Sequence, residues 1–140
     1  MKINKVKKTA LKQAATEALK NPYPLDAKNV FAAAVLTKNG NIYASAQYFS
    51  DTYSLTLHAE QSALAHAASH GEGEIVAIAV TDNLPEDEWS YPCHMCKQLL
   101  YESSQRSGLP MTLIVFDQKG KEEILDLDEI MTHVWPARKS

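Results

Sequence analysis

The sequence predicts an α/β protein, a three-layer α/β/α sandwich built on a mixed five-stranded sheet. Apolar runs of strand length alternate with segments of helical periodicity, which favours a sheet covered by helices on both faces. Two connections between apolar runs are turns too short for a parallel crossover, so part of the sheet is expected to be antiparallel. The chain has 140 residues, 45% of them hydrophobic, and we expect one domain over residues 1–140.

The N-terminal part of the chain predicts a helix followed by a hairpin. The helix is expected from about Asn4 to Lys20, where apolar residues recur on one face until the prolines of NPYPLD stop it. The run NVFAAAVLT, residues 29–37, is typical of a strand buried on both faces. KNGN then supplies an Asn-Gly hairpin signal, so IYASAQYF, residues 42–49, is expected to return antiparallel.

The middle of the chain predicts two helices separated by a strand. SLTLHAEQSALAHAASH indicates a helix from about Leu57 to His70 that ends before Gly71. EIVAIAVT, residues 74–81, follows as a third strand, and an acidic loop leads to a helix over about residues 93–106. Both helices therefore begin where the chain leaves a strand or a loop.

The C-terminal part predicts two more strands and a last helix. MTLIVF, residues 111–116, is the fourth strand, and DQKG is a turn that makes KEEILD, residues 121–126, a short antiparallel fifth strand. LDEIMTHV, residues 127–134, is expected to form the last helix with Asp126 as its cap.

Composition and charge restrict the class of partner. The net charge of −3 and the pI near 5.9 give no basic surface of the kind that binds nucleic acid, and the chain has no basic and aromatic track. No apolar run reaches the roughly 18 residues of a membrane span, and no apolar stretch of signal-peptide type follows the basic MKINKVKK. We expect a cytoplasmic protein with a small-molecule partner and no membrane partner.

Reactive residues gather at the predicted starts of the two central helices. One start carries His58 and Glu60, and the other carries Cys93 and Cys96 after Pro92. Cysteines at i and i+3 share a helix face, so both sulfurs can bind one ion, and proline suits the first turn of a helix. In open α/β sheets such turns gather at one edge, so the two starts are expected to meet there.

A zinc ion with three protein ligands accounts for these residues. His58, Cys93 and Cys96 supply imidazole and thiolate, which leaves a fourth tetrahedral position for water, as in catalytic sites. Glu60 is not needed as a ligand, and beside the ion it can take a proton from that water and deliver it elsewhere. His-x-Glu followed by Pro-Cys-x-x-Cys is the signature of zinc nucleobase deaminases.

Three other interpretations of the same residue types stay open at this point. Cys93 and Cys96 alone also fit a thioredoxin-type redox pair. A structural zinc site would need a fourth ligand such as His94, which points away from the face that the cysteines share. His66 and His70, four residues apart, could bind a second metal ion, although imidazoles are common at a helix C-terminus.

Over nearly its whole length the chain resembles the cytidine deaminase family of small, homotetrameric type. The matching segments are LTLHAEQSALAHA, PCHMCKQLL and FAAAVLTKNGNIY. The resemblance implies a cytidine deaminase-like fold and a zinc hydrolase that turns the cytosine ring of cytidine or deoxycytidine into uracil. It also implies that the N–H of Ala59 meets the pyrimidine carbonyl, that the C=O of Tyr91 receives the leaving amine, and that subunit edges complete each site in a homotetramer. Trp89 and Tyr91 are expected near the site, because their loop leads into Pro92.

The resemblance fails at QYFS, residues 47–50. There the family has Asn-x-Glu-Asn, whose Asn and Glu hold the ribose 3′-hydroxyl. Gln47 retains an amide, Phe49 cannot replace a carboxylate, and Asn29 stands near the place where the family has a phenylalanine on its first strand. The substrate-binding candidates Asn29, Gln47 and Phe49 therefore leave open a modified nucleoside, a free aminopyrimidine or a nucleoside antibiotic of blasticidin S type. A polynucleotide deaminase or a non-catalytic relative is the remaining alternative.

Overall fold

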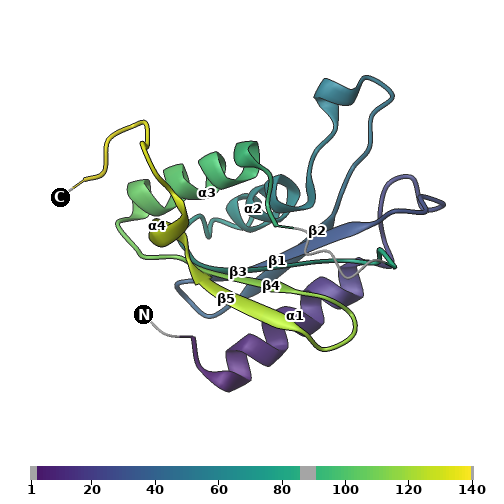
Figure 1. Cartoon of the computed structure of the whole chain (residues 1–140), viewed down its shortest axis with the longest axis horizontal. Helices are drawn as coiled ribbons and strands as arrows, with labels where there is room; N and C mark the ends of the chain where they lie inside the picture. The colour runs from purple at the N-terminus through teal and green to yellow at the C-terminus, as the bar shows by residue number, and fades with distance from the viewer. Residues whose placement is uncertain (1–2, 86–90, 140) are drawn as a thin grey trace.

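A five-stranded mixed sheet forms the centre of the fold in the computed structural model, which describes residues 3–85 and 91–139 (Figure 1). The strands are β1 (Phe31–Thr37), β2 (Ile42–Ala46), β3 (Ile75–Asp82), β4 (Thr112–Phe116) and β5 (Glu122–Asp126). Their order across the sheet is β2-β1-β3-β4-β5. Only the β3–β4 pair is parallel among these neighbours, and the other three pairs are antiparallel. The predicted mixed sheet is therefore confirmed.

Helices cover both faces of this sheet. The helices are α1 (Lys5–Ala18), the 3-10 helix η1 (Tyr53–Leu55), α2 (Ala59–Ser69), α3 (His94–Ser107) and the short α4 (Leu127–Ile130). Figure 1 shows α1 on one face and α2 and α3 together on the other. The three layers of the predicted α/β/α sandwich are thus confirmed, and none of the helices in the described segments has the length and hydropathy of a membrane span.

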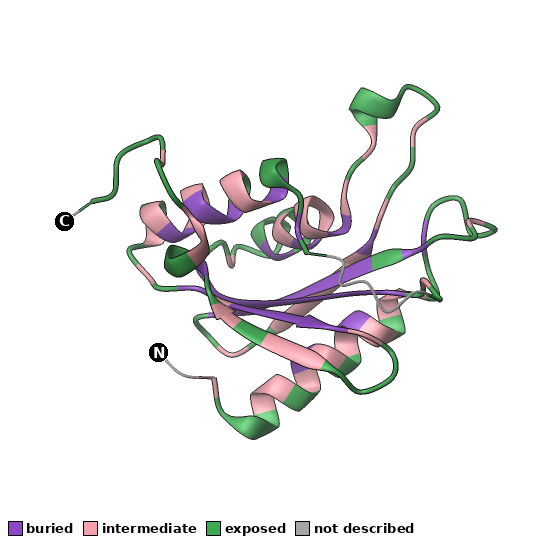
Figure 2. Ribbon diagram, in the orientation of Figure 1, coloured by how far each residue is buried: buried purple, intermediate pink, exposed green. Residues whose placement is uncertain are grey.

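The apolar run of β1 explains why the sheet lies in the middle. Ala33 and Val35 pack into the core beneath α2 and α3, whereas Ala34 and Leu36 pack into the core beneath α1. Successive side chains of a strand point to opposite faces, so an uninterrupted apolar run buries both. Figure 2 shows the central strands as the buried part of the molecule.

Two predicted elements end earlier than expected. The strand predicted over residues 42–49 stops at Ala46, because the backbone of Tyr48 pairs with Leu57 instead of continuing along β1. The helix predicted over residues 127–134 is only α4, because the chain after it runs along α3, where Gln98 Nε2 donates to the Trp135 carbonyl at 2.7 Å. Asp126 occupies the N-cap position of α4, but its side chain makes no capping hydrogen bond.

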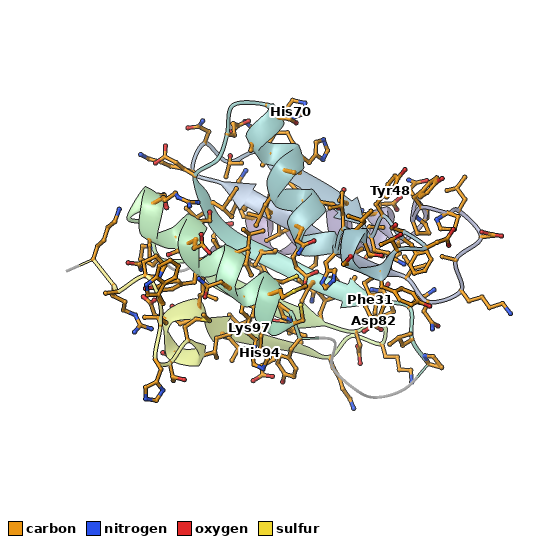
Figure 3. All side chains as sticks on the ribbon, turned by 90° about the horizontal axis from the view of Figure 1, so that it is seen from above. Phe31, Tyr48, His70, Asp82, His94 and Lys97 are labelled. Carbon is orange, nitrogen blue, oxygen red and sulfur yellow. The ribbon has the colours of Figure 1, made fainter. Side chains whose placement is uncertain are left out.

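The starts of α2 and α3 lie on the same face of the sheet and close to each other. The chain leaves β2, passes through η1 and enters α2, while the segment after β3 leads into α3. Figure 3 shows α2 and α3 side by side, with His94 and Lys97 at the start of α3 and His70 at the far end of α2. The two reactive pairs of the sequence therefore meet over the sheet.

Candidate active site

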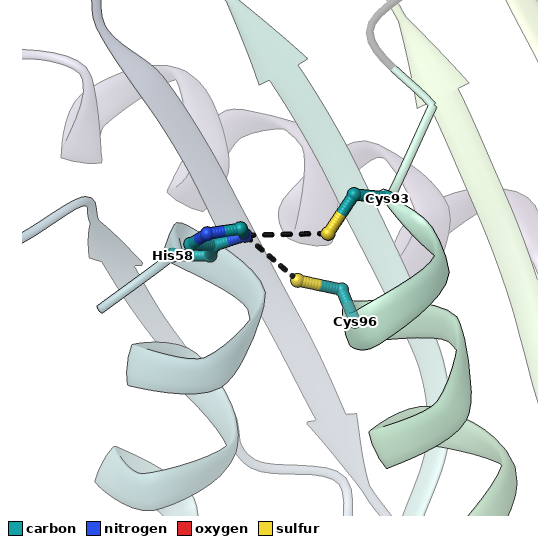
Figure 4. Close-up of side chains that lie close together, drawn as sticks. All are labelled: His58, Cys93 and Cys96. Carbon is teal, nitrogen blue, oxygen red and sulfur yellow. Dashed lines mark hydrogen bonds between the residues drawn. The ribbon is translucent and has the colours of Figure 1, made fainter. Parts of the chain in front are cut away.

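Three potential metal ligands converge between α2 and α3 (Figure 4). His58 is the N-cap residue of α2, Cys93 is the N-cap residue of α3, and Cys96 lies in the first turn of α3. The Nδ1 atom of His58 is 3.4 Å from Cys93 Sγ and 3.3 Å from Cys96 Sγ. All three ligand atoms lie within 4.8 Å of one another. One ion can therefore contact all three.

Local hydrogen bonds fix the two helix starts that carry these side chains. The backbone N–H of His58 donates to Oε1 of Gln61 at 2.9 Å, so the Gln61 side chain closes the start of α2. This leaves the imidazole free to turn toward α3. Pro92 precedes Cys93, and the Cys93 carbonyl accepts the first hydrogen bond of α3 from Lys97 N–H at 2.9 Å.

The spacing of the ligands fits Zn²⁺. Tetrahedral bonds of about 2.3 Å to sulfur and about 2.0 Å to nitrogen place nitrogen and sulfur about 3.5 Å apart. The two measured separations, 3.4 and 3.3 Å, are close to that value. Thiolate and imidazole are also the ligands that zinc prefers, and the N-termini of α2 and α3 stabilise negative charge at this point. The predicted zinc cofactor is thus supported by the geometry of this chain.

Glu60 lies in the first turn of α2, beside the three ligands. Burial raises the pKa of its carboxyl group, and this outweighs the opposing effects of a backbone hydrogen bond, the nearby His58 and the Cys96 thiol. Burial also raises the pKa of Cys96, and the neighbouring Glu60 charge adds to that shift. A carboxyl group with a raised pKa is better suited to take and then give a proton than one at its ordinary value.

A cavity of about 640 Å³ opens onto the ligands and Glu60. Eight of the residues predicted for the site line it: Asn29, Gln47, Phe49, His58, Ala59, Glu60, Tyr91 and Cys93. Cys96, the ninth, is fully buried behind the cavity wall and reaches the site through its sulfur. The structure therefore brings all of the predicted residues to one place, whereas Trp89 lies outside the described residues.

Further lining residues did not emerge from the sequence. Phe31 and Thr81 lie on β1 and β3, which pair at this end of the sheet, and Thr56 comes from the segment between η1 and α2. Figure 3 shows Phe31 close to Asp82, its partner in the register of the two strands. Only the pairing of β1 with β3 reveals Phe31 and Thr81, and no motif marks that pairing.

The Gln47 amide is occupied by the backbone. Its Oε1 accepts from the Phe31 N–H at 2.9 Å, and its Nε2 donates to the Asn29 carbonyl at 2.8 Å. This side chain therefore braces the entry to β1 against the end of β2. Each end of the amide retains one further hydrogen-bonding position, in an orientation that the brace fixes.

The wall next to Gln47 is aromatic. The Phe49 ring packs edge-on against Tyr53, with centroids 5.8 Å apart. Thr56 Oγ1 accepts from the Ser50 N–H at 3.0 Å and donates to the Ser50 carbonyl at 3.3 Å. This hydroxyl therefore joins the two sides of the loop that carries η1. Carboxylates are absent from the described residues that line this wall.

His66 and His70 interact with backbone groups. Nδ1 of His66 is 3.0 Å from the Ala44 carbonyl, and Nδ1 of His70 is 3.0 Å from the His66 carbonyl. Both rings also pack on Tyr43. Within residues 3–85 and 91–139, the group of ligand atoms close enough for a metal ion is His58, Cys93 and Cys96. The structure therefore gives no support to a second metal site at His66 and His70.

Comparison with known proteins agrees with this geometry. A cytidine deaminase from Halalkalibacterium halodurans is 37% identical over 70 residues, and the match spans 50% of this chain and about half, 52%, of that relative. A cytidine deaminase structure from Burkholderia pseudomallei has a TM-score of 0.78 at 22% identity and covers 91% of this chain and 98% of its own. One from Mycobacterium leprae has a TM-score of 0.71 at 24% identity, with 94% and 99% covered.

The structural likenesses establish the fold, and a family match establishes the relationship. The sequence profile described as "Cytidine and deoxycytidylate deaminase zinc-binding region" matches residues 5–108, which is well over half of the chain. That stretch contains both helix starts and ends at Gly108, where α3 is capped. With its three converging ligands and its fold, the chain belongs to the cytidine and deoxycytidylate deaminase zinc-binding family.

Proposed function

We propose that the protein hydrolyses the exocyclic amine of a cytosine-ring nucleoside, so that cytidine or deoxycytidine and water give uridine or deoxyuridine and ammonia. The observation that carries this proposal is the common cavity onto which His58, Cys93 and Glu60 open, with Cys96 directly behind. The family relationship and the cytidine deaminase from Halalkalibacterium halodurans support the same reaction. The substrate is therefore expected to be a small molecule.

His58, Cys93 and Cys96 would hold the ion, and Glu60 would move the protons. Zn²⁺ bound there supplies a Lewis acid that makes water a stronger nucleophile near neutral pH. The Glu60 carboxylate takes a proton from the water that attacks C4 of the cytosine ring and gives it to the ring nitrogen. The carboxylate then takes the second proton, from the hydroxyl now on C4, and passes it to the amine, which leaves as ammonia while C4 keeps the oxygen as a carbonyl.

Two backbone groups are proposed to orient the ring. Ala59 is the first residue of α2, and the first N–H groups of a helix have no partner within it. Its N–H is suited to donate to the pyrimidine carbonyl oxygen. Tyr91 precedes proline, so its backbone is biased to an extended form that aims its C=O into the cavity, toward the leaving amine.

A second candidate is a cytosine-like substrate without an ordinary ribose, such as a modified nucleoside, a free aminopyrimidine or a nucleoside antibiotic. The occupied amide of Gln47 and the aromatic wall at Phe49 favour it. Without a free carboxylate beside it, a sugar hydroxyl would gain little from this wall. Selection for the ribose 3′-hydroxyl is therefore expected to be weak.

We also propose a homotetramer. Large apolar side chains are exposed on the projecting η1 segment and near the C-terminus, as expected of surfaces that other copies cover: Tyr53 is 80% exposed, Leu55 66% and Trp135 78%. Light scattering at micromolar concentration is expected to give four chains, and a stable monomer would contradict the proposal.

The two thiols needed as ligands favour a reducing compartment, so the cytoplasm is the proposed location.

A substrate panel tests the function. Zinc-loaded protein is mixed with cytidine, deoxycytidine, cytosine, 5-substituted analogues and cytosine-containing antibiotics, and loss of the 4-amino chromophore is followed in the ultraviolet. Turnover of at least one compound, with ammonia released in equal amount, is the expected result. Absence of turnover for the whole panel by a protein with about one zinc per chain would contradict it.

A further inference from the structure

The segment that enters the ligand helix α3 is tied to a strand at the edge of the sheet. The Tyr91 phenol donates a hydrogen bond to Oε1 of Glu123 on β5, 32 residues further along the chain. Tyr91 also lines the cavity and lies two residues before the ligand Cys93. The Tyr91–Glu123 bond thus joins the cavity rim to the sheet.

Tyr91, Pro92 and Cys93, which lead into α3, form a stiff unit. The ring of Pro92 fixes its own backbone φ angle, and the residue before a proline is restricted to extended conformations. Pro92 is buried, and Cys93 begins α3 with a hydrogen bond from Lys97 N–H to its carbonyl. Holding the Tyr91 side chain therefore limits the positions that the Cys93 sulfur can reach.

Glu123 is well placed to act as an anchor. It pairs with Val115 of β4 in the antiparallel register, and Val115 belongs to the core beneath α2 and α3. Leu125, which shares its face of β5, packs against the same core. The acceptor of the Tyr91 hydroxyl is thus carried by a strand whose position the core determines.

The neighbouring Glu122 has a different task. Its carboxylate pairs with Lys8 and Lys12 of α1, with 2.7 Å between Glu122 Oε2 and Lys8 Nζ. Successive residues of a strand face opposite sides, so Glu122 lies on the face covered by α1 and Glu123 lies on the face that carries the site. The chain thereby offers a matched control, the same side chain one residue away.

We propose that Glu123 is a positioning residue, which acts through the Tyr91 hydroxyl to hold the cavity rim and the Cys93 ligand in place for the metal and the substrate. The effect on the substrate rests on the proposed function, whereas the effect on the metal does not. Glu123 touches neither the metal nor the substrate. Replacing it therefore changes how firmly the metal and the substrate are held, and not how the protons move. KM and the rate of zinc release are expected to respond, and kcat much less.

The test uses zinc-loaded full-length Glu123→Ala, Glu123→Gln, Tyr91→Phe and the Tyr91→Phe/Glu123→Ala double variant, with Glu122→Ala as the control. Zinc release to a coloured chelator is timed, and kcat and KM are measured on the best substrate of the panel. A hydrogen bond to a carboxylate is worth about 10–100-fold at most, and this one is exposed and acts only through the cavity rim, so Glu123→Ala is expected to release zinc about three- to tenfold faster or to bind substrate about three- to tenfold less tightly. Glu123→Gln keeps an acceptor and is expected to stay within threefold of the parent protein.

The double variant and the control separate positioning from a general loss of stability. The double variant should be no worse than Glu123→Ala, because both changes remove the same contact. Glu122→Ala should lower Tm and leave zinc release and KM within twofold. Unchanged zinc release and KM in both Glu123→Ala and Tyr91→Phe, or equal changes in Glu122→Ala, would overturn the proposal. Tyr91→Phe keeps the ring and gives the answer if Glu123→Ala does not fold.

The chelator measurement requires no turnover. A parent protein without activity would therefore contradict the proposed function and leave the positioning role of Glu123 to be decided by zinc release. Conversely, an active parent whose Glu123 variants all behave normally would contradict the positioning role alone.

Discussion

The two ends of the cavity differ in what their polar groups do. At the end between α2 and α3, His58, Glu60 and Cys93 point into shared space, and Cys96 completes the group from behind. At the opposite end, Gln47 braces the backbone of residues 29–31, and Phe49 presents a ring. One end is equipped for chemistry on a bound molecule, and the other uses its polar groups to hold the protein itself.

The two ends of the cavity depend on different segments of the chain. The ligands depend on two helix starts that the sheet holds in place, and the His58 N–H bond to Gln61 needs only one turn of α2. The wall depends on the segment between β2 and α2, which lies outside both helix starts. We therefore expect substitutions at one end of the cavity to leave the other end unchanged.

Removal of a metal ligand should have the largest effect. His58→Ala and Cys93→Ala are expected to lose zinc and activity, and to melt at lower temperature because the ion links α2 to α3. Metal analysis and a thermal melt check this, with His94→Ala as the control, since His94 is exposed and belongs outside the ligand group. Full zinc occupancy in both ligand variants would show that the ligands are wrongly assigned.

Replacement of the proton carrier should come next. Glu60→Gln keeps the shape of the side chain and cannot carry protons, so kcat is expected to fall about 10²–10⁴-fold while zinc content and Tm stay unchanged. Steady-state kinetics and metal analysis on the same preparation provide the measurement. Activity within tenfold of the parent protein on any turned-over substrate would refute this role of Glu60.

Substitution of Phe49 in the aromatic wall should change substrate preference by a smaller factor. Phe49→Glu places a carboxylate beside the braced Gln47 and is expected to raise the preference for cytidine over 3′-deoxycytidine by about 10–100-fold, the value of a hydrogen bond to a charged group. Phe49→Leu remains apolar and should leave that preference unchanged. Equal preferences in Phe49→Glu and Phe49→Leu would remove this wall from the recognition of the sugar.

The smallest effect is expected at the end of the molecule away from the cavity. Hydrogen bonds to Glu72 from Tyr43, from Asn41 and from Thr37 lower the pKa of this carboxyl group from 4.5 to about 2. A lowered folded-state pKa stabilises the protein above the unfolded value, and this contribution is lost as the pH falls from 4.5 toward 2. The Tm difference between the parent protein and Glu72→Gln should therefore be present at pH 7 and close over that range, as thermal melts at several pH values will test. A difference independent of pH would contradict this account.

The fold and the reacting end could be predicted from the sequence because their signals are local. Strand length, the Asn-Gly turn and the helix starts each occupy a few neighbouring residues, and the structure confirms their order. Prediction of the metal ligands also required the expectation that two helix starts meet at one edge of the sheet. The predicted ends of the strand after Ala46 and of the last helix were wrong, because distant segments compete there for the backbone.

The contacts across the fold could not be predicted. Gln47 lies 16 residues from Phe31, and Tyr91 lies 32 residues from Glu123, so no spacing rule connects the members of either pair. The sequence shows that Phe49 cannot act as a carboxylate, but it does not show that the neighbouring amide is already engaged. Such contacts exist only once the sheet has brought the segments together.

The most direct test of the account compares cytidine with 3′-deoxycytidine in the zinc-loaded parent protein. We predict that both are deaminated and that their kcat/KM values differ by less than about tenfold, because the wall offers no free carboxylate to the 3′-hydroxyl. Rejection of 3′-deoxycytidine by a hundredfold or more, about 2.7 kcal/mol, would contradict the account, since groups at the wall would then hold the ribose after all.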